Sequence, residues 1–247
     1  MSLRHHEIAE AAHRILNPFT HDKLMLLGEV ARVGPTTRIL DIACGKGELL
    51  CQWASVYGSS GHGVDLSEVF LAAARDRADE LAVADRVTYT HSDGADFVTD
   101  ERFDLVSCLG AMWFGGSLEA SAAMLKRWAA DDAVLLIGEP FWNEEPPPEA
   151  LAAYDGFTSL ARLADRLQAT GLELVEMVLA DGDSWDRYAA SKWWTVRHWL
   201  AANPDDAEAP AMRDFLATGR SQHLEFVRRY LGWGVFVLVP AGSGRGG

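Results

Sequence analysis

Hydrophobic and polar positions follow two different periods along this chain. Near the N-terminus, apolar residues at helical spacing predict helices over His5–Leu16 and Asp22–Val33, which end at Asn17-Pro18 and Gly34-Pro35. Further along, short apolar runs alternate with helical patterns. These runs predict seven strands, at Arg38–Ile42, Gly61–Asp65, Val87–Thr90, Phe103–Leu109, Ala133–Gly138, Leu172–Ala180 and Trp233–Val239. Strands that alternate with helices indicate an α/β fold built on a mostly parallel sheet.

The second half of the chain departs from this alternation. Three consecutive prolines predict a stiff extended loop over Asn143–Glu149. Two helices, Trp185–Ala202 and Asp206–Tyr230, are predicted between the last two strands, where a hairpin would need only a few residues. The predicted helices that follow earlier strands run through Tyr57 and over Glu68–Leu81, Leu118–Ala129 and Thr158–Thr170. The extra pair of helices indicates a lid or an association surface.

The composition narrows the class of partner. The 247 residues include 22 Lys and Arg against 36 Asp and Glu, which gives a net charge of −14. Nucleic-acid binding needs a positive surface, so we expect neither a nucleic-acid partner nor an anionic membrane. Three cysteines without a CxxC pattern predict neither disulfides nor a metal site, and a cytoplasmic protein is expected. No apolar run reaches the length of a membrane-spanning helix.

A glycine-rich turn follows the first predicted strand. In Asp41-x-Ala43-x-Gly45-x-Gly47, glycines allow a sharp turn and a close approach of the backbone to a ligand. Open α/β sheets bind ligands at this place, beyond the carboxyl ends of their strands. The same pattern also occurs in ordinary tight turns between a strand and a helix, so the loop alone does not identify a ligand.

Two further acids stand at the ends of the next strands. Asp65 ends the second strand, where a carboxylate accepts hydrogen bonds from both ribose hydroxyls, and Asp93 follows the third, where an acceptor meets an adenine amino group. Each has a simpler alternative, because Asp65 also suits a helix cap and Asp93 an Asx turn. Their occurrence at the ends of successive strands favours a nucleoside ligand.

Dinucleotides and S-adenosylmethionine both suit such a site. The dinucleotide fingerprint GxGxxG is incomplete here, because Leu50 stands where the third glycine belongs. An acid at Asp41 suits a ligand with an ammonium and a sulfonium, and it repels a pyrophosphate. The residues therefore favour S-adenosylmethionine over the cofactor of a nucleotide-dependent oxidoreductase.

The chain resembles the class I, Rossmann-like methyltransferases. The matching stretches are ILDIACGKGELL (39–50), GVDLS (63–67), HSDGADF (91–97) and FDLVSCLGAMW (103–113), with Ala43 in place of the first glycine of the family pattern. LNPF (16–19), CGKGE (44–48) and GEPFW (138–142) resemble a bacterial subgroup of small-molecule methyltransferases. The resemblance implies a seven-stranded, mostly parallel sheet with helices on both faces, an antiparallel last strand and a helical insertion between strands six and seven.

The resemblance also implies a domain organisation and a set of cofactor contacts. We expect one methyltransferase domain over 1–247, with an N-terminal helical cap (1–34), a cofactor-binding core (35–140), acceptor-side helices with strand six (141–232) and the last strand (233–240). The implied contacts with S-adenosylmethionine, or its product S-adenosylhomocysteine, are Asp41, Ala43, Cys44, Gly45, Gly47, Asp65, Leu66, Ser92, Asp93, Gly94, Cys108, Leu109 and Gly110.

Methyl transfer from a sulfonium needs mainly proximity, orientation and exclusion of water, so a catalytic dyad is not required. Two residues are candidates for proton transfer: Glu139, which closes strand five, and His21, in the N-terminal segment. The loop after strand four lacks the Asn/Asp-Pro-Pro-aromatic pattern of nucleobase methyltransferases. We therefore expect a small-molecule acceptor, with a non-catalytic S-adenosylmethionine-binding or regulatory protein on the same fold as the alternative.

Aromatic residues are the candidates for an acceptor pocket. Trp113, Phe114 and Trp142 follow strands four and five and are expected at the cleft. The helix from Trp185 carries a wide apolar arc that predicts core packing. Trp194 and His198 lie on its opposite side, and such an exposed pair indicates an acceptor pocket or another subunit, so the protein is expected to be a monomer or a homodimer.

Overall fold

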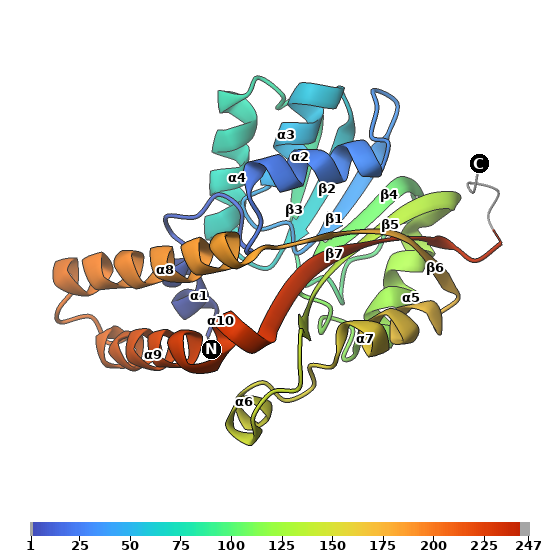
Figure 1. Ribbon diagram of the computed structural model, residues 1–247. Helices are drawn as coiled ribbons and strands as arrows, with labels where there is room; N and C mark the ends of the chain where they lie inside the picture. Colours follow the sequence, from blue (N-terminus) through green and yellow to red (C-terminus); the bar gives the residue numbers. More distant parts are fainter. Residues whose placement is uncertain (1, 243–247) are drawn as a thin grey trace.

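Seven strands form one sheet in the order β3-β2-β1-β4-β5-β7-β6 (Figure 1). The computed structural model describes residues 2–242, so residue 1 and residues 243–247 of the predicted domain lie outside the described part. The strands are β1 (Arg38–Ile42), β2 (Ser60–Asp65), β3 (Val87–His91), β4 (Phe103–Leu109), β5 (Ala129–Trp142), β6 (Leu172–Leu179) and β7 (Leu231–Pro240). The helices are α1 (Leu3–Ala9), α2 (His21–Val30), α3 (Glu48–Tyr57), α4 (Glu68–Glu80), α5 (Leu118–Trp128), α6 (Pro148–Ala153), α7 (Leu160–Gln168), α8 (Gly182–Ala202), α9 (Ala209–Gln222) and α10 (Arg228–Tyr230).

The strand directions confirm the predicted fold class. Strands β1 to β5 pair in parallel, whereas β7 is antiparallel to both β5 and β6. The register places Ile42 beside Cys108, and Asp65 beside His91, so several strands end at one edge. This edge is where an open α/β sheet binds its ligands.

Helices cover both faces of the sheet. The side chains of α2 and α3 join one buried cluster, in which Trp53 is fully buried and donates its indole N–H to the carbonyl oxygen of Leu24. The side chains of α5 and α7, among them Leu125 and Leu167, form a second cluster on the other face. Figure 1 shows α2, α3 and α4 on one side of the sheet and α5 and α7 on the other. This layering confirms the helices on both faces of the sheet that the family resemblance implied.

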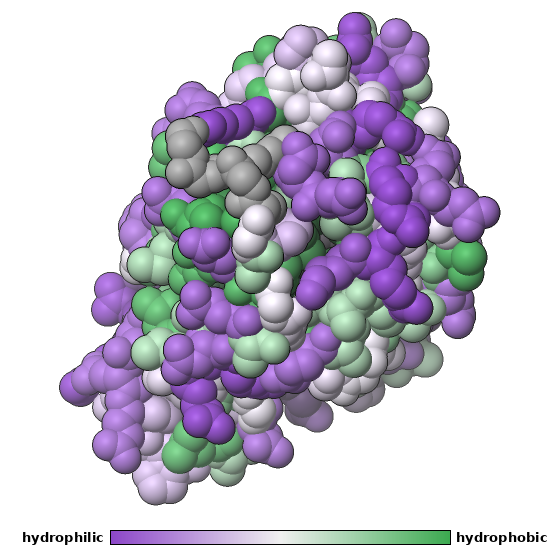
Figure 2. All heavy atoms as spheres, turned by 90° about the vertical axis from the view of Figure 1, so that its right-hand side faces the viewer, coloured by the Kyte–Doolittle hydropathy of each residue, from purple (hydrophilic) through white to green (hydrophobic). Residues whose placement is uncertain are grey.

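The α8–α9 pair extends beyond the sheet at the end where the parallel strands finish (Figure 1). The two helices lie side by side and α1 packs against α8. Figure 2 shows the face opposite this end, where hydrophilic residues predominate and apolar areas are interspersed. Within residues 2–242, no helix has the length and hydropathy needed to cross a membrane.

The first predicted helix is wrong in its length. Helix α1 ends at Ala9, with Glu10 as its C-cap, rather than continuing to Leu16. The backbone carbonyl oxygens of Glu10, Ala11 and His13 bind the ammonium of Lys46, which lies in the loop after β1. These hydrogen bonds use carbonyl groups that a longer helix would need. Residues 10–20 are therefore not helical, although their apolar residues recur at helical spacing.

Two further predictions for the second half need correction. The loop predicted at Asn143–Glu149 is present but ends two residues early, because α6 begins at Pro148, in the first turn, where a missing N–H costs nothing. The helix predicted over Asp206–Tyr230 is divided by a π-helical turn at His223–Val227. The His223 imidazole in that turn pairs with Asp186 at 2.8 Å, so a contact with α8 accompanies the change of helical pitch.

Candidate functional site

The loop between β1 and α3 passes through three left-handed residues. Ala43, Gly45 and Gly47 have φ values of 57°, 55° and 64°. A Cβ atom on Gly47 would lie 2.6 Å from the Tyr89 hydroxyl, and one on Gly45 would lie 2.6 Å from Cδ1 of Leu16. Only glycine fits these two positions, whereas Ala43 adopts the left-handed conformation at a cost of roughly 1 kcal/mol.

Two buried carboxylates lie at the ends of β1 and β2. Asp41 is 4% exposed and accepts a 2.6 Å hydrogen bond from the Ser107 hydroxyl, and burial raises its pKa to about 7. Asp65 accepts backbone N–H bonds from Gly45, at 2.7 Å, and from Ser67, at 2.8 Å, while burial raises its pKa. Two partly desolvated acids at one strand edge favour a ligand that brings positive charge or hydroxyl donors.

A cavity of about 50 Å³ lies between this loop and residues 14–17 of the N-terminal segment. Its lining includes five of the predicted cofactor residues: Asp41, Ala43, Cys44, Gly45 and Leu109. The side-chain oxygen of Asn17, which also lines the cavity, is buried and has no hydrogen-bond partner among residues 2–242. An unpaired buried acceptor costs about 1–3 kcal/mol, so the cavity suits a donor such as an ammonium group.

Lys46 fastens the N-terminal segment to the glycine loop. Its side chain is 8% exposed, and its ammonium donates to the carbonyl oxygens of Glu10 at 2.8 Å, Ala11 at 2.9 Å and His13 at 2.7 Å. Burial lowers the pKa of Lys46. The three carbonyl groups take the place of water around a charge that stands between two glycines of the loop.

Glu10 connects the same segment to α8. Its buried carboxylate accepts hydrogen bonds from the Tyr188 hydroxyl at 2.7 Å and the Lys192 ammonium at 2.6 Å, and pairs with Nδ1 of His13 at 2.6 Å. Burial opposes ionisation of Glu10, but the bond to His13 and the charge of Lys192 prevail and lower its pKa to about 2. The glycine loop, the N-terminal segment and α8 therefore form one polar network.

The residues predicted to contact the adenine end lie after β2 and β3. The Asp93 carboxylate accepts a 2.9 Å hydrogen bond from the backbone N–H of Ala95. This bond forms an Asx turn, which the sequence analysis gave as the alternative to an adenine contact. The Ser92 hydroxyl donates to the carbonyl oxygen of Asp93, and Leu66 is 47% exposed. A Cβ atom on Gly94 would lie 3.2 Å from the Phe114 ring. Phe114 thus packs on the adenine-side loop, not in the place expected for the acceptor.

Comparison with known proteins identifies the family. A family model described as a methyltransferase domain matches residues 39–130. A crystal structure of an S-adenosylmethionine-dependent methyltransferase from Geobacter sulfurreducens, in complex with S-adenosylhomocysteine, is 44% identical, with a TM-score of 0.92 over 97% of this chain and 98% of that one. The chain belongs to the S-adenosylmethionine-dependent methyltransferases.

Two further relatives agree with this assignment. A methyltransferase from Thiobacillus denitrificans, also solved with S-adenosylhomocysteine, is 42% identical, with a TM-score of 0.89 over 94% of this chain and 96% of that one. The E. coli protein YjhP, described as uncharacterised, is 42% identical over 94% of this chain and 96% of its own length, and its crystal structure superposes with a TM-score of 0.91. The family and the cofactor class predicted from the sequence are therefore confirmed.

In this methyltransferase, Glu139 of β5 lies beside the loop after β4. Cys108 is fully buried, and Gly110 donates its N–H to the carbonyl oxygen of Gly138 at 2.8 Å. Glu139 is half-buried, and burial raises the pKa of its carboxyl to about 7 although it accepts a hydrogen bond from the backbone N–H of Met112. A carboxylate with this pKa can accept a proton near neutral pH.

The other proton-transfer candidate lies at the surface. His21 is exposed and is the first residue of α2, whose N-cap is Thr20. Its side chain makes no hydrogen bond within the described residues. This exposed position does not support a role for His21 in proton transfer.

Three of the predicted acceptor residues, Trp142, Trp194 and His198, line none of the three cavities described for this structure. Trp142 is 5% exposed and packs against Tyr154 and Phe157, with its indole N–H bonded to the carbonyl oxygen of Phe157. The prediction that it rims the cleft is wrong, because Trp142 is buried against these two aromatic rings. Trp194 is 64% exposed and contacts His198 edge-to-face, with ring centroids 4.4 Å apart.

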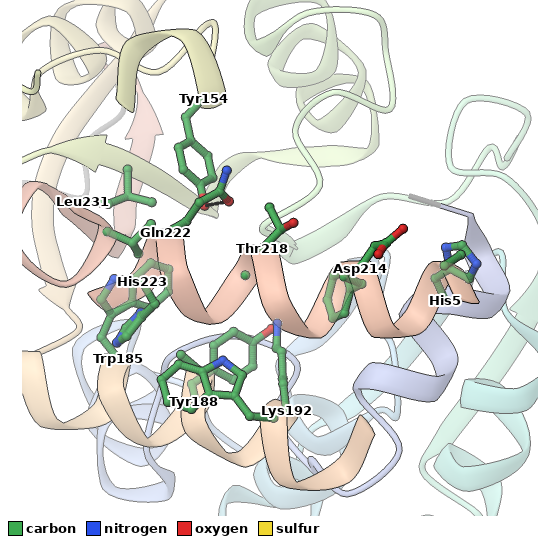
Figure 3. Close-up of a pocket in the computed structure, with 16 residues that line it drawn as sticks. His5, Tyr154, Trp185, Tyr188, Lys192, Asp214, Thr218, Gln222, His223 and Leu231 are labelled. Carbon is green, nitrogen blue, oxygen red and sulfur yellow. Dashed lines mark hydrogen bonds between the residues drawn. The ribbon is translucent and has the colours of Figure 1, made fainter. Parts of the chain in front are cut away.

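The apolar arc of α8 forms core packing, as predicted, only in its second half, where Val196, Trp199 and Leu200 pack in a buried cluster with residues of α1 and α9. Trp185, Tyr188, Ala189, Lys192 and Trp193 instead line a cavity of about 560 Å³ between α8 and α9 (Figure 3). The arc faces α9, and the two helices leave space between them. Trp113, also predicted at the cleft, is 73% exposed on the loop after β4.

Sequence reasoning missed four residues that build the site: Glu10, Asn17, Lys46 and Tyr188. The sequence offered a signal for Lys46 alone, because this lysine stands between Gly45 and Gly47, where the backbone is expected to pass close to other groups. The other three had no local signal. The roles of Glu10 and Tyr188 depend on a contact between segments that lie 178 residues apart in the chain.

Proposed function

We propose that this chain transfers a methyl group from S-adenosylmethionine to a small-molecule acceptor. The observation that carries the proposal is the pair of buried carboxylates, Asp41 and Asp65, at the loop that holds Gly45. The family membership supports the reaction class, and the absence of a basic run in the sequence favours a small acceptor over nucleic acid. The chain would act as one domain, in which residues 1–34 cover the cofactor-binding core.

The residues of the site fit this cofactor. Asp65 would accept hydrogen bonds from the ribose hydroxyls, while Asp41 and the unpaired oxygen of Asn17 would hold the ammonium group. Asp93 and Gly94 would flank the adenine. When bound, S-adenosylmethionine supplies an electrophilic methyl group on a sulfonium. The chain's contribution is to orient the reactants and exclude water, and Lys46 serves this by holding residues 10–17 over the loop.

Glu139 would remove the proton from an acceptor hydroxyl or amine. Its pKa of about 7 supports this role, since a base works best when its pKa is near the working pH. Glu139 lies within β5, three residues before the strand ends at Trp142, and not at the strand end that the sequence predicted. The bond from the Met112 N–H would keep the carboxylate oriented.

Calorimetry tests the cofactor site. Wild-type protein should bind S-adenosylhomocysteine at micromolar concentrations and should bind no NAD(P). Asp65→Ala should weaken binding by about 100-fold, because two hydrogen bonds to a charged acceptor are lost. Asp76→Ala, at an exposed site in α4, is the matched control and should bind as the wild type does. Unchanged affinity in Asp65→Ala would contradict the ribose role. Binding without consumption of the methyl donor across a metabolite screen would favour a non-catalytic cofactor-binding protein.

A further inference from the structure

The loop after β4 lies between two glycines in the left-handed conformation. Gly110 and Gly116 have φ values of 96° and 91°. At the start of the loop, the N–H of Gly110 donates to the carbonyl oxygen of Gly138 in β5 at 2.8 Å. Beyond Gly116 the chain enters α5. The loop therefore bridges the strand that carries Glu139 and the helix that follows.

One side chain of α5 binds the middle of this loop. The Ser121 hydroxyl donates to the carbonyl oxygen of Met112 at 2.6 Å and accepts a 2.9 Å bond from the N–H of Gly115. Ser121 is fully buried. A hydroxyl has one proton and two lone pairs, so it can make both bonds at once. Ser121 therefore fixes two separate peptide groups of the loop.

The local chemistry of α5 does not explain a serine at this position. Inside a helix, serine is less favourable than alanine, and its hydroxyl commonly bonds to a carbonyl oxygen one turn earlier. Here the backbone N–H of Ser121 donates to the Ser117 carbonyl oxygen at 2.9 Å, as in any helix. The hydroxyl leaves the helix and binds the loop instead, so the reason for the serine lies in the loop.

The loop lies directly against the backbone of α5. A Cβ atom on Gly115 would lie 2.8 Å from the backbone nitrogen of Ser121. A backbone atom cannot move aside as the end of a flexible side chain can, so glycine is required at this close approach. The absence of a side chain at Gly115 brings the loop within reach of a side chain as short as serine.

Met112 connects this anchor to Glu139. Its side chain is 2% exposed and packs in the cluster on the α5 and α7 face of the sheet, and its backbone N–H bonds the Glu139 carboxyl. Ser121 holds the carbonyl group of the same residue. Because Met112 is held through both its side chain and its carbonyl group, its N–H keeps a fixed direction.

Two other groups act on Glu139 electrostatically. They are Arg166 of α7, which pairs with Glu119 of α5 at 2.7 Å, and the fully buried Cys108 of β4. The bonds of Ser121 to the loop involve none of these three residues. A change at Ser121 therefore reaches Glu139 through Met112.

We propose that Ser121 is a positioning residue for methyl transfer, which aims the Met112 N–H at the Glu139 carboxylate and so keeps this base oriented. The inference rests on the proposed function, in which Glu139 removes the acceptor's proton. A serine with a merely structural role would affect stability alone. A positioning serine also affects the protonation of Glu139.

The first test follows Glu139 itself by ¹³C NMR. The protein is labelled at its glutamate carboxyl carbons, and the Glu139 signal is assigned by its loss in Glu139→Gln. The wild-type titration midpoint should reflect the pKa of about 7. Ser121→Ala loosens the Met112 N–H, and a weakened hydrogen bond to the carboxylate should raise the midpoint by about one pH unit. An unchanged midpoint in Ser121→Ala would overturn the inference.

Two further variants separate positioning from loss of stability. Ser117→Ala makes the same substitution at the N-cap of α5, where the hydroxyl accepts the N–H of Ala120 at 3.1 Å. It should destabilise the helix and leave the midpoint unchanged. Ser121→Cys retains a weaker donor and should give an intermediate midpoint. Equal shifts in Ser117→Ala and Ser121→Ala would mean that lost stability explains the effect, and the proposal would be wrong.

Cofactor affinity provides a second control. Phe114, in the same loop, packs on the adenine-side loop, where a Cβ atom on Gly94 would lie 3.2 Å from its ring. This contact does not use the Ser121 hydroxyl, so calorimetry should show unchanged affinity for S-adenosylhomocysteine in Ser121→Ala. A large loss of affinity would show that the whole loop has moved, which contradicts a specific role at Glu139.

Turnover separates this inference from the proposed function. With an acceptor found in the metabolite screen, kcat of Ser121→Ala should be about tenfold below the wild type at pH 6 and approach it at pH 9, because a base with a higher pKa is less ionised at low pH. KM for S-adenosylmethionine should stay constant. A raised midpoint with a wild-type pH profile of kcat would refute the inference. If no compound is methylated, the proposed function fails, and the NMR titration still decides whether Ser121 orients Glu139.

Discussion

The cofactor site and the cavity between α8 and α9 are built in different ways. The cofactor side takes most of its groups from one continuous stretch, in which strands between Arg38 and Pro140 end at the same edge. The aromatic cavity takes its lining from helices as far apart in sequence as α1 and α9, together with Leu231 at the start of β7. The cofactor site depends on local turns and strand ends, whereas the α8–α9 cavity exists only when distant helices pack.

This difference has a functional consequence. A loop fixed by strand ends and glycines serves one cofactor across a family, while packed helices can change their lining without disturbing the loop. The network from Lys46 through Glu10 to Tyr188 is where these two regions meet. The predictions below disturb the site at Glu139, at this junction and at Asp41.

The largest effect is expected at Glu139. Glu139→Gln retains an oxygen for the Met112 N–H but cannot take a proton, so turnover of a hydroxyl acceptor should fall on the order of 10³-fold. In the wild type, kcat should rise with pH to a plateau above about pH 7, and the variant should lack this rise. Glu145→Gln, an exposed change nearby, is the control. A wild-type pH profile retained in Glu139→Gln would rule out Glu139 as the base.

The junction should show the next largest effect. Lys46→Met keeps the length of the side chain but leaves three carbonyl oxygens without their donor, so the free energy of unfolding should fall by about 3 kcal/mol. Urea denaturation measures this change. Binding of S-adenosylhomocysteine should weaken as well, because the N-terminal segment is no longer held over the loop. Lys126→Met, which removes one bond to a carbonyl oxygen at the other end of the sheet, should cost less and leave binding unchanged.

The pH dependence of cofactor binding should show the smallest effect. With a pKa of about 7, Asp41 is mostly protonated at pH 6 and mostly ionised at pH 8. Affinity for the ammonium of S-adenosylhomocysteine should therefore rise about tenfold over this range. Asp41→Asn should bind with the weak affinity of low pH throughout. A pH-independent wild-type affinity would place the ammonium elsewhere.

The same raised pKa affects the stability of the ligand-free protein. The pKa of Asp41 is raised from 3.8 in the unfolded chain to about 7 in the folded one. Its contribution to stability is therefore fully present below about pH 4 and is lost as the pH rises through 7. Asp41→Asn should remove this part of the pH dependence of unfolding.

Much of the fold followed from the sequence, and the errors have a common cause. The strand that carries Asp41 and the helix that follows Gly47 were predicted because apolar period and turn chemistry are local. The first helix was extended too far because Lys46 takes carbonyl groups that a helix would otherwise use. Trp142 was placed at the cleft because its position in the chain does not reveal the rings that cover it.

The sequence by itself determined the family, the cofactor and the edge of the sheet at which the cofactor belongs. These follow from acids and glycines at fixed distances from apolar strands, and a parallel sheet brings such strand ends together. Only the tertiary structure decided that the arc of Trp185 and Tyr188 faces a cavity and that Trp194 does not. A helical pattern shows which residues share a face, but the partner of that face is set by the packing of helices distant in the chain.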